Sequence, residues 1–184
     1  MEKIVELERE KWEDHPLRYS YTTRNHWAVG VTRTGDDFSV SFAKKAFAAP
    51  QVKNSHPSDR LFKPWFDGVR AWGIVADGRL LAAVETAVEE WNNRLRVTHL
   101  WVDESLQRRG IGTALMDTAV ARAKDERRRV LVLETQSCNE TAIAFYLAYG
   151  LSLTGFDTCD YSNDDIARGE VRLEFGMIIE SDNL

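Results

Sequence analysis

The sequence predicts an α/β fold with one sheet of mixed strand direction. Two observations lead to this fold class: a tight-turn signal between two apolar runs, typical of antiparallel strands, and an alternation of strand and helix patterns in the second half. The chain has 184 residues, of which 43% are hydrophobic, and this is the size of one domain with one core. We therefore expect residues 1–184 to form a single domain.

Composition excludes several classes of protein. The 24 basic and 29 acidic residues give a pI of about 5.4, which argues against a nucleic-acid partner and mildly favours cationic ligands. Cys138 and Cys159 are too few for a disulfide framework, so a reducing cytoplasm is expected. Residues 1–12 lack the apolar stretch of a secretion signal, and no window reaches transmembrane length. We expect a cytoplasmic monomer or homodimer without a membrane or nucleic-acid partner.

The first third of the chain predicts two strands and a long connection. His26–Thr32 and Phe38–Phe42 alternate apolar and polar residues, as half-buried strands do. Ala43–Gly68 contains three prolines and predicts a long irregular connection with a short helix. Connections of this length are often binding loops or lids.

A hairpin is the clearest local signal. The apolar runs Ala71–Ala76 and Arg79–Val88 flank Asp77–Gly78, a pair typical of tight turns, and predict two antiparallel strands. A second turn at Asn92–Asn93 leads into a further strand, Leu95–Val102.

Helices and strands alternate in the second half. Apolar residues recur every fourth position from Ile111 to Ala123 and predict a helix over Gly110–Arg127. The short apolar run Val130–Leu133 is expected of a strand buried on both faces.

A second helix and two strands complete the chain. The helix Asn139–Tyr149 is capped by its first residue and ended by Gly150. The segments Leu151–Tyr161 and Val171–Ile179 predict two strands, joined by a polar turn at 162–165.

The most specific feature is the segment Gln107–Gly112, between a strand end and a helix start. Gly110 and Gly112 allow successive N–H groups to turn toward one point, where the helix N-terminus adds partial positive charge. This geometry binds a pyrophosphate, and Arg108 and Arg109 can add side-chain charge. The alternatives are an ordinary strand-to-helix turn and arginines that form a solvated face.

The spacing Gln-x-x-Gly-x-Gly in this segment resembles the acetyl-CoA signature of the GNAT superfamily of N-acetyltransferases; it lacks the Lys of a Walker motif and the third glycine of a dinucleotide motif. One departure from the family is Leu151, where Phe is frequent. The resemblance implies a GNAT fold, with a twisted, mostly antiparallel mixed sheet of about seven strands and helices on both faces, best matched over residues 70–180. It also implies acetyl-CoA as co-substrate. A second family pattern, Asn-x-x-Ala-x-x-Phe-Tyr-x-x-x-Gly, occurs at Asn139, Ala142, Phe145, Tyr146 and Gly150.

A closer resemblance covers the chain from Glu85 onward. The segments Trp91–Asn92, Glu134–Gln136 and Gly155–Asp157 are similar to those of streptothricin acetyltransferases, GNAT enzymes that acetylate an amino group of a cationic antibiotic. This resemblance implies streptothricin as the small-molecule amine substrate and a role in antibiotic resistance. Two alternatives stay open: a GNAT enzyme for a protein, peptide or polyamine amine, and a non-catalytic CoA-binding regulatory module.

The resemblance also assigns the acetyl-CoA site. Leu100–Val102 match the strand edge that, in the family, forms hydrogen bonds with the pantetheine arm of acetyl-CoA. One backbone N–H of that edge also polarises the thioester carbonyl. Attack by the amine turns this carbonyl oxygen into an oxyanion, which the N–H stabilises. Tyr146 is the implied general acid for the departing thiolate; the alternative is an aromatic residue that packs its helix against the sheet. The residues assigned to acetyl-CoA are Leu100, Trp101, Val102, Gln107, Arg108, Arg109, Gly110, Ile111, Gly112, Thr113, Asn139 and Tyr146.

A carboxylate is needed to take the proton of the acceptor amine, directly or through water. Glu85 is the first candidate, because it lies mid-strand among apolar residues and the streptothricin group has a matching Glu; the alternative is the polar face of a half-exposed strand. Glu134, Asp157 and Asp160 are the candidate substrate-binding residues. The four histidines show no i, i+4 pairing with acids, so no metal site is expected.

Overall fold

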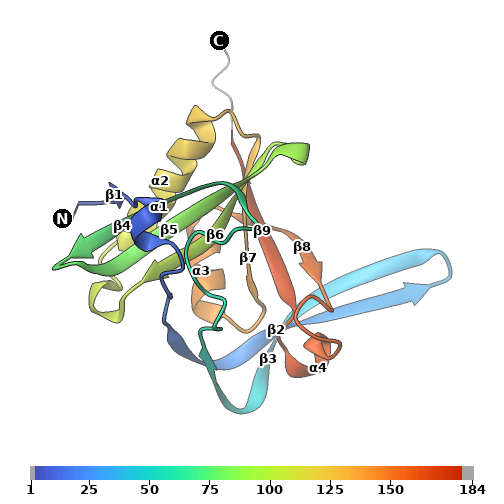
Figure 1. Cartoon of the computed structure of the whole chain (residues 1–184). Coiled ribbons are helices and arrows are strands. Elements are labelled where there is room, and N and C mark those ends of the chain that lie inside the picture. The colour runs from blue at the N-terminus through green and yellow to red at the C-terminus, as the bar shows by residue number, and fades with distance from the viewer. Residues whose placement is uncertain (1–2, 180–184) are drawn as a thin grey trace. The chain divides into compact units, whose positions relative to one another are not determined.

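The computed structural model describes residues 3–179 and contains a seven-stranded sheet and a separate two-stranded sheet (Figure 1). The larger sheet has the strand order β1-β4-β5-β6-β7-β9-β8. Its pairs β1/β4, β4/β5 and β5/β6 are antiparallel and β6/β7 is parallel, so the expected mixed, mostly antiparallel sheet is confirmed. The strands of this sheet are β1 Val5–Glu6, β4 Asp67–Ala76, β5 Arg79–Glu89, β6 Arg94–Val102, β7 Val130–Gln136, β8 Ser152–Asp157 and β9 Arg172–Ile178.

Four helices accompany the strands, and the chain divides into two compact units. The helices are α1 Arg9–Trp12, α2 Ile111–Asp125, α3 Glu140–Tyr149 and α4 Asp165–Arg168. The first unit comprises the chain up to Tyr19, Asn54–Leu133 and the chain from Gly176; the second comprises Ser20–Lys53 and Glu134–Phe175. The short elements β1 and α1 have too few residues to give a periodic pattern, and the sequence did not predict them.

In the first unit, the predicted hairpin is confirmed. Asp77 and Gly78 join β4 to β5 with φ of +50° and +74°, the left-handed pair that a two-residue hairpin turn requires. Asn93, at φ +54°, ends the short 3₁₀ turn Glu90–Asn92 and leads the chain into β6.

Helix α2 packs on β4, β5 and β6 through the predicted apolar stripe. Ile111, Leu115, Ala119 and Ala123 are all buried. On the other face of the hairpin, Trp12 of α1 packs in a buried cluster with Ala71 and Ala83, so within this unit helices cover both faces.

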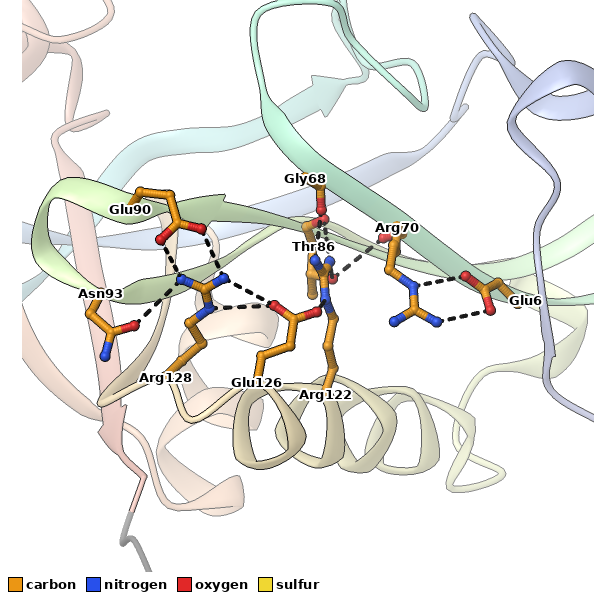
Figure 2. Close-up of polar contacts among 9 residues, drawn as sticks. All are labelled: Glu6, Gly68, Arg70, Thr86, Glu90, Asn93, Arg122, Glu126 and Arg128. Atoms are coloured by element: carbon orange, nitrogen blue, oxygen red, sulfur yellow. Dashed lines mark hydrogen bonds and ion pairs between the residues drawn. The ribbon is translucent and has the colours of Figure 1, made fainter.

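A buried arginine fastens the second half of α2 to the hairpin (Figure 2). Arg122 donates from Nη1 to the backbone oxygen and Oγ1 of Thr86, at 3.0 and 2.7 Å, and from Nη2 to the carbonyl of Gly68 at 2.6 Å. Its Nε pairs with Glu126 at 2.7 Å, and Arg128 extends the network to the surface through Glu126 and Glu90. These bonds hold α2 in place on β4 and β5, and therefore also hold the position of its N-terminus.

In the second unit, the two-stranded sheet corrects one prediction. Strands β2, Ser20–Thr34, and β3, Asp37–Asn54, form a long ribbon (Figure 1), and β3 continues through 43–54, where an irregular connection was expected. Pro50 is tolerated because each strand of a two-stranded sheet has an open edge, where the missing N–H costs no ladder bond. The irregular connection is confined to 55–66.

The end of the second unit also differs in detail from the prediction. Helix α3 has the expected caps: Asn139 Oδ1 accepts from the N–H of Ala142, and Gly150 has φ +109°. Strand β8 ends at Asp157 and does not reach Tyr161, and the predicted polar turn leads into α4. Asp165 explains both changes, since its buried carboxylate accepts from the N–H of Tyr161 and starts a helical turn.

Candidate active site

The predicted phosphate cradle lies at the N-terminus of α2. Gly110, the residue before the helix, has φ +77°, and a Cβ built there meets no atom of residues 3–179 within 4 Å. The first N–H groups of a helix have no partner within it, and here they follow a glycine that opens onto free space. A helix N-terminus with this opening fits the pyrophosphate of acetyl-CoA.

The loop before the cradle is tied to β6. Gln107 Nε2 donates to the carbonyl of Val102, the last residue of β6, at 3.2 Å. Asp103 accepts from the N–H of Ser105 and holds the short 3₁₀ turn between them. Arg108 has φ +59°, a conformation that is uncommon without glycine, and like Arg109 it is exposed.

Strand β6 pairs with a neighbouring strand along only part of one of its two edges. It pairs with β5 along its length but with β7 only at Arg94–Arg96, opposite Val130–Val132. Residues from Val97 on lie outside that register, and they include the predicted pantetheine edge at Leu100–Val102. The indole of Trp101 donates to the carbonyl of Arg18 at 3.0 Å.

Glu85 is wholly buried, with 0% of its surface exposed. The alternative interpretation, that Glu85 lies on the polar face of a half-exposed strand, is therefore wrong. Thr98 Oγ1 donates to its Oε1 at 2.7 Å, and the backbone N–H of Phe62 donates to its Oε2 at 2.5 Å. The sequence pointed to Glu85 but not to these two partners, because they lie 13 and 23 residues away along the chain.

In the second unit, α3 carries the two residues assigned from the family pattern. Asn139 uses its Oδ1 for the helix cap, so its Nδ2 group is the part that can donate to a ligand. Tyr146 is buried, and its ring lies 5.9 Å from that of Phe175. Burial and the charge of Glu134 raise the pKa of the Tyr146 phenol, so the hydroxyl stays protonated through the neutral range.

The structure brings two of the three predicted acceptor carboxylates together. Arg172 of β9 pairs with Glu134 at 3.6 Å and with Asp160 at 3.0 Å, while the hydroxyl of Tyr161 donates to Glu134 at 2.6 Å. Burial and the charge of Glu134 raise the pKa of Tyr161. The carboxylate of Asp157 accepts from the N–H of Cys159 at 2.9 Å, and this bond, together with the charge of Arg172, lowers its pKa.

Arg172 is a residue of the candidate site that the sequence analysis missed. It also lies 4.0 Å from Glu174, so its guanidinium is near three carboxylates. Arg172 lies between the apolar Val171 and Leu173 in a predicted strand. The same pattern, a charged residue within an apolar strand, pointed to Glu85, so it could also have pointed to Arg172.

Residues 3–179 hold no group of three or more His, Cys, Asp or Glu side chains placed to bind a metal. No helix in this described part is both long and apolar enough to cross a membrane.

Three comparisons with known proteins agree with this geometry. The chain is 30% identical over 166 residues to the streptothricin acetyltransferase of Streptomyces lavendulae, covering 86% of the chain and 84% of the relative. It is 34% identical over 73 residues to streptothricin acetyltransferase A of Bacillus subtilis, a match that spans 40% of the chain and only 42% of that relative. A nourseothricin acetyltransferase of known structure has a TM-score of 0.73 at 28% identity, covering 97% of the chain and 98% of that protein.

The family assignment rests on a longer match than the two motifs. The pattern of the Acetyltransferase (GNAT) family matches residues 2–151, which include β5, β6, the cradle and α3. Together with the seven-stranded mixed sheet and the glycine-opened N-terminus of α2, this match shows that the chain belongs to the GNAT family of acetyltransferases.

Proposed function

We propose that the chain acts as a single-domain, acetyl-CoA-dependent N-acetyltransferase that modifies a primary amine of streptothricin. The observation that carries the proposal is the extent of the similarity: the match to the Streptomyces lavendulae enzyme covers 84% of that enzyme, including the part of the chain before β4. Acceptor specificity in such enzymes lies outside the donor motif, so a match confined to the cradle would support the donor alone.

The residues of the first unit have separate tasks in this reaction. Acetyl-CoA, when bound, supplies an activated acetyl group. The helix N-terminus at Gly110 and the exposed Arg108 and Arg109 bind the pyrophosphate, while the free edge at Leu100–Val102 aligns the pantetheine arm. A backbone N–H of this edge stabilises negative charge on the carbonyl oxygen under attack, and Glu85 accepts the proton of the amine.

Tyr146 is the proposed general acid that protonates the departing thiolate. The position of Tyr146 in the family pattern on α3 supports this role, and the phenol is protonated at neutral pH, as a general acid must be. Direct transfer to the amine is supported by the state of Cys138: burial raises the pKa of its thiol, which disfavours the thiolate that an acyl-enzyme would need.

The acidic cluster supports a cationic acceptor. Glu134 and Asp160 share the guanidinium of Arg172, and two carboxylates beside one cation favour the approach of an ammonium group. Polyamines and lysine-bearing peptides are also cationic, so this charge does not distinguish them from streptothricin. An experiment must identify the preferred amine.

A panel of amines tests the substrate. Release of free thiol from acetyl-CoA is measured with streptothricin, lysine, spermidine and a lysine-bearing peptide. We expect the highest kcat/KM for streptothricin, with a KM that rises with ionic strength because salt screens the acidic cluster. A strong preference for another amine would remove streptothricin and leave the acetyltransferase reaction in place. Thermal stabilisation by acetyl-CoA without thiol release from any amine would favour a CoA-binding module.

The general-acid role of Tyr146 has its own test. Tyr146→Phe is expected to lower kcat about a hundredfold with little change in acetyl-CoA affinity, since the phenol acts only in the transition state. The matched control is Tyr149→Phe on the same helix, whose ring contacts Phe145 and which should keep normal kcat. An unchanged kcat in Tyr146→Phe, where chemistry limits turnover, would return Tyr146 to a packing role.

A further inference from the structure

The carboxylate of Glu85 is held by two donors that come from different parts of the first unit. Thr98 of β6 donates its hydroxyl to Oε1 at 2.7 Å, and Phe62, in the connection before β4, donates its backbone N–H to Oε2 at 2.5 Å. The bond from Thr98 has the length of a charge-assisted hydrogen bond between a hydroxyl and a carboxylate. Hydrogen bonds to both oxygens hold the buried carboxylate in one orientation. A general base needs such an orientation, because the proton reaches it from one direction.

The hydroxyl of Thr98 reaches Glu85 because β6 carries an extra residue at this point. The register pairs Glu85 with His99 and Thr86 with Val97, which leaves Thr98 as the additional residue of a β-bulge. In an unbroken ladder, Thr98 would point to the face opposite that of Glu85 and His99. The bulge turns Thr98 onto Glu85, and bulges often re-aim a side chain beside an active site.

The second donor comes from a backbone in an unusual conformation. Phe62 has φ +59°, the left-handed region that a bulky residue seldom adopts, and it is buried beside Leu61. The N–H of Leu61 donates to the carbonyl of His15, and its carbonyl accepts from the N–H of Asp14. These two backbone bonds hold the segment in place, so the N–H of Phe62 stays within hydrogen-bond distance of Oε2.

Taking Glu85 as the base of the proposed function, we propose that Thr98 is the positioning residue of that base. The Thr98 hydroxyl fixes Oε1, while Oε2 accepts from the N–H of Phe62 and keeps a second lone pair for a relaying water. The proton then passes from the ammonium nitrogen through that water to Oε2. An N–H bond breaks as an O–H bond forms, and the electron pair left on nitrogen attacks the acetyl carbon, whose bond to sulfur then breaks to release the thiolate of CoA.

Other ionisable groups lie on the elements packed against Glu85. His99 lies opposite it on β6, Lys63 follows Phe62 and pairs with Asp14, and His15 lies beside Trp12. Burial lowers the pKa of His15, so this imidazole is neutral near pH 7. His99→Gln is the control for the neighbouring imidazole of His99.

The experiment compares Thr98→Val, which keeps the shape and removes the hydroxyl, with Thr98→Ser, which keeps the hydroxyl. For Thr98→Val we expect kcat/KM near neutral pH to fall about tenfold or more, as loss of a hydrogen bond to a charged group does. The acidic limb of the pH profile should move to higher pH, because the ionised carboxylate loses a stabilising donor. Thr98→Ser should stay within about twofold of wild type.

Glu85→Gln separates this inference from the proposed function. If Glu85→Gln is slow at neutral pH and partly rescued at higher pH, while Thr98→Val keeps the wild-type profile, the positioning role is overturned and the base assignment stands. If Glu85→Gln keeps the wild-type rate and profile, both are overturned. Should Thr98→Val fail to fold, Thr98→Ala is measured in its place. If the panel favours another amine, the same comparison uses that amine.

Discussion

Gly110→Val is expected to abolish the thermal stabilisation that acetyl-CoA gives to the wild-type protein. At a ligand concentration of one hundred times Kd, a single site adds about 2.7 kcal/mol, which raises the Tm of a protein of this size by about 5–10 °C. The valine side chain would project into the open space before α2 where the phosphates are expected, and a β-branched residue disfavours the φ of +77°. The measurement is a melting curve with and without acetyl-CoA.

Gly78→Val is the matched control for this experiment. Gly78 has φ +74° in the β4–β5 turn, and a Cβ there also meets no atom of the described residues within 4 Å. The two substitutions therefore carry a similar backbone strain, but only Gly110 borders the helix N-terminus. We expect Gly78→Val to melt earlier and still be stabilised by acetyl-CoA. A Gly110→Val protein that responds normally to acetyl-CoA would contradict the cradle assignment.

Arg122→Met is expected to lower the free energy of unfolding by about 3 kcal/mol, because the buried acceptors on Gly68 and Thr86 would lose their donor and Glu126 one of its two arginine partners. For a protein of this size, this corresponds to a fall in Tm of about 10 °C. Because methionine has a long, unbranched side chain like that of arginine, the change in stability reflects the lost hydrogen bonds more than a change in side-chain volume. Urea unfolding and melting curves measure it.

The control for this prediction is Arg128→Met, in the same network (Figure 2). The Arg128 side chain is 12% exposed, but its partner Glu90 is 74% exposed, and ion pairs with an exposed partner contribute little to stability. We therefore expect a much smaller change in stability for Arg128→Met. Equal effects from the two substitutions would mean that Arg122 does not act as the buried anchor of α2.

Several features of this protein were determined by the sequence itself, because they depend on residues close together along the chain. The turn at Asp77–Gly78, the apolar stripe of α2 and the caps of α3 follow from local propensity and spacing, and each was found where it was predicted. The position of the segment Gln107–Gly112 belongs to the same group, since the end of β6, the two glycines and the start of α2 lie close together along the chain.

Only the tertiary structure decided the surroundings of the candidate catalytic side chains. Glu85 is polar in the sequence but buried in the fold, because Phe62 and Thr98 reach it from distant positions and satisfy both oxygens. In the same way, Arg172 joins carboxylates from separate segments into one cluster. Local patterns predict which element a residue forms, whereas the partner of a buried charge depends on contacts that exist only after the chain has folded.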